Sequence, residues 1–141
     1  MKKAIFNSAN FTATKFDSAA DKARFANHFV RFVESGFKDT LFYDWFYKRL
    51  SMTFGHIAHY NRHGFYAEWF SDAAARARFL KHTAAGYGYG DPAWTYSDVE
   101  KALTAWVKEK KLDDYWAGRA ATDLEAAERA ELARLTFKYG S

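Results

Sequence analysis

The sequence predicts a mostly α-helical α+β domain, a compact unit of five to six helices preceded by a small N-terminal β-hairpin. Apolar residues recur at helical spacing through most of the chain, and several of these stretches start at a capping residue or stop at a glycine. Residues 11–16 are instead rich in strand formers. A chain of 141 residues, 49% hydrophobic and 20% aromatic, is long and apolar enough to bury a core.

The N-terminal region predicts two short strands. Residues 4–6 are apolar, residues 7–10 are typical of a turn, and residues 11–16 favour an extended backbone. Because an isolated hairpin is only marginally stable in water, we expect these strands to pack on the helices that follow.

The first two helices are predicted over residues 19–34 and 39–50. Asp17 or Ser18 can cap the first helix, whose aromatic residues recur three and four positions apart. Gly36 can adopt the left-handed conformation that ends a helix, so it marks the boundary between the two.

The middle of the chain predicts a third helical segment that Ser51 caps and Gly64 terminates, either separate from the second helix or continuous with it through a kink. Residues 65–70 fit a short strand or one more helical turn. Residues 71–85 form a short helix in this interpretation, with Gly86 as its stop signal.

The C-terminal part predicts two helices. Ser97 with Glu100 forms a capping-box pattern ahead of a strong apolar stripe, and Thr122 with Glu125 forms a second one ahead of an alanine-rich helix to residue 137. Its apolar stripe is thin, so much of this last helix should face solvent. The resulting organisation has strands and an aromatic-rich helical lobe over 1–85, a glycine and aromatic loop over 86–96, and a two-helix lobe over 97–141.

Composition excludes several functional classes. The chain has no cysteine, which excludes disulfide frameworks, thiolate zinc sites and cysteine nucleophiles. The net charge of +4 comes from mixed charges without a basic run, and no apolar stretch is long enough to span a bilayer. Without such an apolar stretch we expect a cytoplasmic protein. Because no nucleophile motif is present, we expect a non-enzymatic protein without a cofactor.

Three histidines define one candidate site. If residues 51–62 are helical, His56, His59 and His63 share one stripe, and imidazoles at that spacing can bind zinc. No acidic residue lies between them, unlike in the zinc-protease helix. A solvated or interfacial histidine stripe is therefore the alternative interpretation.

Aromatic and basic side chains define the second candidate site, a partner-binding surface. Glycines in the loop 86–96 allow close backbone approach, and tyrosine, tryptophan and arginine dominate interface hot spots. The same side chains could stack on bases and contact phosphates, which leaves nucleic acid open as a partner. The predicted partner-binding residues are Tyr87, Tyr89, Trp94, Tyr96, Tyr43, Tyr47, Arg49 and Arg62.

The aromatic and histidine-rich stretch over residues 53–70 resembles small accessory proteins of bacteriophages and mobile elements, a group that includes anti-CRISPR proteins. The resemblance lies in character: short, cysteine-free, aromatic-rich and without enzyme motifs. It implies a protein in a bacterial cytoplasm that inhibits a defence complex, such as a CRISPR effector, by occupying its surface. The alternatives are a nucleic-acid-binding module and, with His56, His59 and His63, a metal-dependent enzyme.

Overall fold

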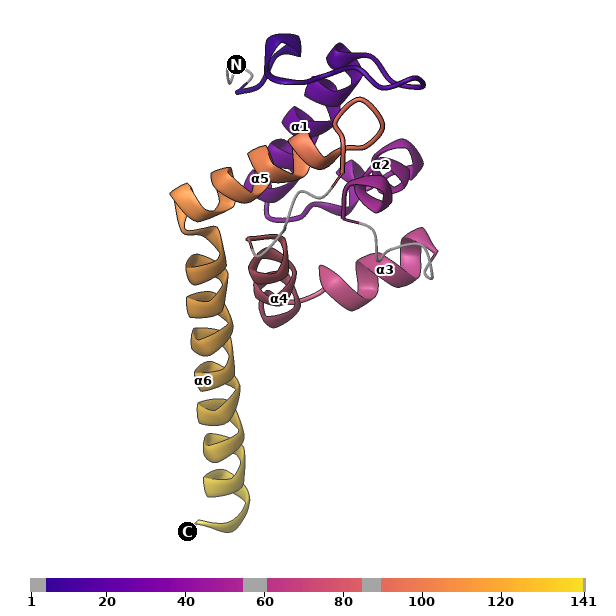
Figure 1. The fold of residues 1–141 in the computed structure, drawn as a ribbon. Helices are drawn as coiled ribbons and strands as arrows, with labels where there is room; N and C mark the ends of the chain where they lie inside the picture. The colour runs from indigo at the N-terminus through magenta and orange to yellow at the C-terminus, as the bar shows by residue number, and fades with distance from the viewer. Residues whose placement is uncertain (1–4, 55–60, 85–89, 141) are drawn as a thin grey trace.

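The computed structural model describes residues 5–54, 61–84 and 90–140, and in these ranges the chain is helical with no strands (Figure 1). A helical domain is therefore confirmed. The elements are a 3₁₀ helix at Ser8–Asn10, α1 at Ala19–Glu34, a 3₁₀ helix at Asp39–Leu41, α2 at Asp44–Phe54, α3 at Arg62–Trp69, α4 at Ala73–Ala84, α5 at Ser97–Lys110 and α6 at Leu112–Tyr139.

The predicted N-terminal β-hairpin is wrong for the described residues. The backbone N–H of Phe6 donates to Oδ1 of Asn27 over 2.9 Å, and Nδ2 of Asn27 donates back to the Phe6 carbonyl over 2.8 Å. Farther along, the N–H of Thr12 donates to a carboxylate oxygen of Asp98 over 2.9 Å. Side chains of α1 and α5 thus take backbone hydrogen bonds that a partner strand would have taken.

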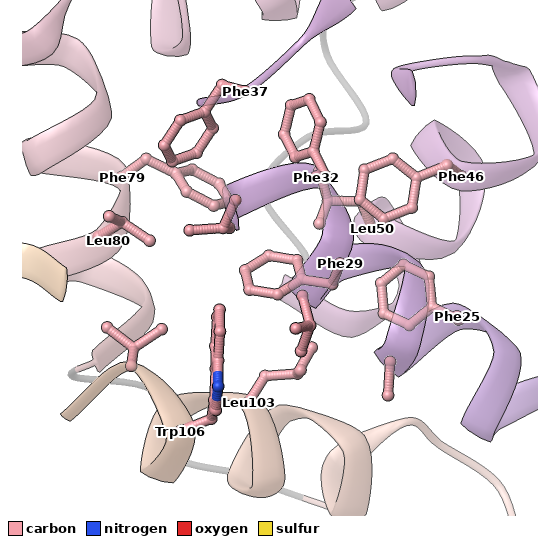
Figure 2. Packing of buried hydrophobic residues seen from close by; sticks show 14 of the residues in the cluster. Phe25, Phe29, Phe32, Phe37, Phe46, Leu50, Phe79, Leu80, Leu103 and Trp106 are labelled. Atoms are coloured by element: carbon pink, nitrogen blue, oxygen red, sulfur yellow. The ribbon is translucent and has the colours of Figure 1, made fainter. Parts of the chain in front are cut away.

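Helix α1 begins and ends where the sequence predicts, and it forms the centre of the core. Ser18 and Asp21 cap each other's backbone N–H groups at its start. Phe25, Phe29 and Phe32 follow at helical spacing and are completely buried. Figure 2 shows their rings meeting side chains from the neighbouring helices, so one core joins the N-terminal and C-terminal parts of the chain.

The end of α1 also follows the prediction, with one addition. Gly36 has a φ of 80°, and Phe37 after it also takes a left-handed φ of 62°. A bulky residue rarely adopts this conformation. Complete burial between the rings of Phe32 and Phe70, at centroid distances of 5.2 Å and 5.2 Å, holds it there.

Helices α2 to α4 correct the predicted boundaries. Asp39–Leu41 forms a 3₁₀ turn, and α2 starts only at Asp44 and continues through Ser51 to Phe54. Residues 65–70, predicted as strand or helical turn, lie mostly in α3, and Gly64 lies near the start of that helix.

Helix α6 is 28 residues long and starts ten residues before the predicted cap at Thr122. It begins at Leu112, directly after α5, with Lys111 alone in the left-handed conformation between them. Thr122, predicted as a cap, lies inside α6 and donates from Oγ1 to the Gly118 carbonyl over 3.0 Å. Glu125 and Arg129, four residues apart on α6, form an ion pair at 2.6 Å.

The first turns of α6 pack along α4, and the rest extends away from the body (Figure 1). Trp116 is its one buried residue, and every residue from 121 to 140 is exposed. Within the described ranges, none of the helices combines the length and the apolar character that a membrane span requires.

His28 is a buried titratable group in this core. Its Nε2–H donates to the Leu41 carbonyl over 2.7 Å, and its ring packs on Phe46 at a centroid distance of 4.5 Å. Burial lowers the pKa of His28, and the positive charges of Arg31 and Arg24 lower it further, against the Leu41 hydrogen bond. The folded protein therefore favours the neutral imidazole.

Because of His28, we expect the protein to become less stable as the pH is lowered. Below about pH 6.5 the unfolded chain binds a proton at His28 more readily than the folded chain does, so the free energy of unfolding decreases. Urea unfolding at about pH 7.5 and about pH 5.5 should show this loss, and His28→Gln should reduce it. An equal loss in both proteins would contradict the assignment to His28.

Candidate binding surface

A completely buried lysine fixes the loop that precedes α5. Nζ of Lys22, on α1, donates to the carbonyls of Pro92 and Thr95 over 2.8 and 2.9 Å. It also forms an ion pair with Asp98 at 2.9 Å. All three ammonium protons thus have acceptors, which removes the main cost of burying this charge.

The loop itself is a closed set of local hydrogen bonds. Oδ1 of Asp91 accepts from the N–H of Ala93, and the Asp91 carbonyl accepts from the N–H groups of Trp94 and Thr95, all over 2.9 Å. Ser97 Oγ donates to the Gly90 carbonyl over 2.9 Å. Ser97 therefore closes the loop and leaves the predicted capping box unformed, with Tyr96 at the N-cap position.

Trp94 projects from this loop and is 72% exposed. Its backbone lies between the two carbonyls that Lys22 binds, so the indole is presented on a fixed support. A large exposed ring on a rigid backbone loses little conformational entropy on binding, which makes it a suitable interface anchor.

Tyr96, predicted as a partner-binding ring, lies in the core with 2% exposure. Its ring packs edge-on against Phe25 at 5.9 Å and lies 5.3 Å from Nζ of Lys22. Burial, and then the negative charge of Asp17, raise the pKa of Tyr96 well above its ordinary value. We therefore exclude Tyr96 from the binding surface, because the loop uses this ring to attach itself to the core.

A second aromatic and cationic cluster lies where α2 meets α1. The guanidinium carbons of Arg24 and Arg49 lie 4.1 and 4.6 Å from the centre of the Trp45 ring. Arg49 also forms an ion pair with the buried Asp17 at 3.0 Å, and the ring of Tyr43 stacks 6.3 Å from Trp45. The arginines are held in place by these contacts, and Arg24 and Tyr43 remain exposed.

The Asp17 ion pair also fixes the segment before α1. Asp17 N–H donates to Oγ1 of Thr14 over 2.9 Å, and Asp17 accepts from Arg49 through its side chain. Phe16, its neighbour, is 85% exposed. We call Phe16, Arg24, Tyr43 and Trp94 the α1-end residues, since all four are exposed on segments that meet the N-terminal half of α1.

The remaining predicted binding residues have other surroundings. Tyr47 is half-buried, and burial raises its pKa. Nε of Arg62 forms an ion pair with Asp44 at 2.9 Å, and its NH1 donates to the Phe42 carbonyl over 3.3 Å. Arg62 also lines a shallow surface pocket of about 210 Å³ with His63 and Tyr66. Tyr87 and Tyr89 lie outside the described residues.

The histidine site can be placed only in part. His63 is exposed in the first turn of α3, with Nε2 3.3 Å from NH2 of Arg62. His56 and His59 lie outside the described residues. Among the residues described, no group of histidine, aspartate and glutamate side chains has the geometry to hold a metal ion.

Sequence reasoning missed Phe16 as a surface candidate, because it belongs to a segment predicted as a strand that packs on helices. The sequence marks Arg24 only as one of several basic residues among aromatic ones, for which a solvated helix face is the favoured interpretation. The aromatic pattern over residues 42–47 does predict that some of these rings remain at the surface, and Tyr43, 37% exposed just before α2, is one of them.

Comparison with known proteins gives no relative from which a role could be transferred: no family model matches the chain, and neither a curated protein nor a solved structure matches it significantly.

We expect Lys22→Met to destabilise the protein by about 3 kcal/mol, the usual cost of removing one partner of a buried ion pair. The change leaves Asp98 without its counter-charge and two loop carbonyls without a donor. Urea unfolding measures the loss. Lys101→Met, at an exposed position on the same helix as Asp98, is the matched control and should change stability little. Equal stability of the two variants would contradict a stabilising role for the Lys22 ion pair and hydrogen bonds.

Proposed function

We propose that this chain is a non-enzymatic protein-binding module that contacts its partner through the α1-end residues, with Trp94 as the main anchor. The observation that supports the proposal best is the 72% exposure of Trp94 on a loop held by the buried Lys22. A surface tryptophan that bound no partner would gain little from the two hydrogen bonds by which Lys22 holds its loop. A ring that must meet a partner in one orientation gains from each of them.

The composition of the surroundings supports the same proposal. Tryptophan, tyrosine and arginine are the residue types enriched at hot spots, and all three occur among the α1-end residues. Arg24 lies against the Trp45 ring and loses less conformational freedom on binding than a freely rotating arginine would. Phe16 adds an apolar side chain that is 85% exposed on a segment fixed by the Asp17–Arg49 pair.

As the partner we propose a bacterial defence complex. Inhibition of a bacterial defence complex, as in anti-CRISPR proteins, fits a small binding protein whose contact residues are rigid before binding. In this proposal the module blocks a site on the complex by steric occlusion. The proposal rests on the exposed aromatic residues and on the resemblance in character described above.

We expect Trp94→Ala to weaken partner binding by at least about 2 kcal/mol, roughly a 30-fold increase in Kd, because a hot-spot ring is lost while its loop remains clamped. The proteins retained by immobilised wild-type chain from bacterial lysate should include one that Trp94→Ala loses. Phe137→Ser, which removes an exposed ring from the far half of α6, is the matched control and should retain it. Identical retained proteins for all three would refute the role of Trp94.

The partner class has its own test. Bacteria with an active CRISPR system reject a targeted plasmid, so expression of an inhibitor should restore its transformation, and Trp94→Ala should restore it less. No restoration across a panel of CRISPR types would refute that class while leaving protein binding intact. Retention of nucleic acid that falls steeply with salt would instead support the nucleic-acid alternative.

A further inference from the structure

The outer part of α6 is a helix without a partner in the monomer. From residue 121 to 140 every side chain is exposed, although Leu124 and Leu132 are large and apolar and are 61% and 65% exposed. An isolated helical segment of this length is only marginally stable in water. Salt bridges such as Glu125–Arg129, exposed at i and i+4, add a few tenths of a kcal/mol each.

Six apolar side chains of α6 lie on one face, spaced symmetrically about Glu128. With a helical rotation of about 100° per residue, these six residues and Glu128 lie within an arc of about 80° around the helix axis. They recur on average every 11/3 residues, close to the period of a straight helix, so the face does not drift around the axis. We call them the α6 stripe: Ala117, Ala121, Leu124, Glu128, Leu132, Leu135 and Tyr139.

The stripe reads the same in both directions from its centre at residue 128. The intervals between its apolar members are 4, 3, 8, 3 and 4 residues from either end. Two copies of α6 packed antiparallel, with a two-fold axis at residue 128, therefore place a small residue against a large one toward each end. The facing pairs are Ala117 with Tyr139, Ala121 with Leu135, and Leu124 with Leu132.

The charges beside the stripe favour the antiparallel direction. Residues 121–128 carry three acidic and no basic side chains, whereas residues 129–139 carry three basic and one acidic. Antiparallel packing sets the acidic half of one helix against the basic half of the other. In this register the partner residues nearest to Glu125 along the axis are residues 129–133, which include Arg129. A parallel pair would set like halves together.

The two ends of the stripe also fit each other in shape. Beside Ala117, a pocket of about 170 Å³ lies between α4 and α6, lined by Ala77, Arg78, Lys81 and Asp114 among others. In the antiparallel register this pocket lies opposite Tyr139, which is 73% exposed. The lining combines Ala77 and Ala117 with charged side chains, a mixture that suits a phenol ring with its apolar body and polar hydroxyl.

We propose that the chain forms a two-fold symmetric dimer in which the α6 stripes of two copies pack antiparallel, with Tyr139 of each copy seated in the α4–α6 pocket of the other. The paired length, from residue 117 to residue 139, is about 33 Å. This interface uses a surface distinct from the α1-end residues and does not depend on the function proposed for them.

The oligomeric state and its response to charge test this proposal. Sedimentation at increasing protein concentration should show a monomer–dimer equilibrium. Leu132→Glu should raise the dimer Kd at least 10-fold, because it places a charge opposite Leu124. Phe137→Ser, on the opposite face of α6, should leave the Kd unchanged. Circular dichroism would show that both variants keep the folded body, since both positions are exposed.

A substitution at Glu128, the centre of the α6 stripe, should change the dimer Kd in the opposite direction. Two Glu128 carboxylates meet at the two-fold axis and repel each other in the proposed dimer. Glu128→Leu should therefore lower the dimer Kd at least 10-fold. A monomer at all concentrations, including with Glu128→Leu, would overturn the proposal, as would a dimer that Leu132→Glu leaves unchanged.

Cross-linking tests the direction of packing, and the absence of cysteine from the chain makes single-cysteine variants unambiguous. With a short bismaleimide, Glu128→Cys should cross-link to itself. Leu124→Cys should not cross-link to itself but should cross-link when mixed with Leu132→Cys. Self-cross-linking of Leu124→Cys that is as efficient as that of Glu128→Cys would indicate parallel packing and overturn the register.

Discussion

The buried ammonium group of Lys22 is the interaction on which the arrangement of this fold depends. A lysine without solvent exposure is tolerated only if its charge and all three protons are satisfied. The acceptors come from Pro92, Thr95 and Asp98, about seventy residues away in sequence. The loop before α5 must therefore lie against the first turns of α1, which in turn fixes where α5 begins and which ring of the loop faces solvent.

Around this constraint, aromatic side chains make up thirteen of the 23 buried residues of the core cluster in the described part of the chain. Phe32 contacts the rings of Phe37, Phe42, Phe46 and Phe70 at centroid distances between 5.1 and 5.5 Å, mostly in tilted or edge-on geometries. Such pairs favour defined orientations and contribute more than their buried area alone. They also explain how Phe37 is kept at a positive φ. The aromatic content of the sequence is thus mainly a property of the core. Trp94 and Phe16, like Phe137 and Tyr139 on α6, are strongly exposed exceptions.

Local patterns predicted the helices well and the connections poorly. The limits of α1 followed from Ser18, Gly36 and the phenylalanine spacing, because those signals act within one or two turns. The hairpin failed because Asn27 and Asp98, remote in sequence, take the backbone hydrogen bonds of residues 6 and 12. Thr122 and Ser97 fit the pattern of helix caps, but their hydroxyl groups donate to the Gly118 and Gly90 carbonyls instead. Of the predicted binding residues, Trp94 and Tyr43 are exposed and Tyr96 is buried. The sequence could not distinguish Tyr96 from the other two, because its burial depends on contacts with Phe25 and Lys22, which are remote in sequence.

The single left-handed residue between α5 and α6 gives the long helix the mechanics of a lever. Lys111, with a φ of 52°, sets the angle between α5 and α6, and the first turns of α6 pack along α4, where Trp116 is the one buried residue of the helix. Beyond this attachment, a tilt of about 10° would move the tip of the exposed arm over residues 121–139 by roughly 5 Å, given a rise of 1.5 Å per residue. Small rearrangements around one indole ring would thus be magnified into large displacements at the far end.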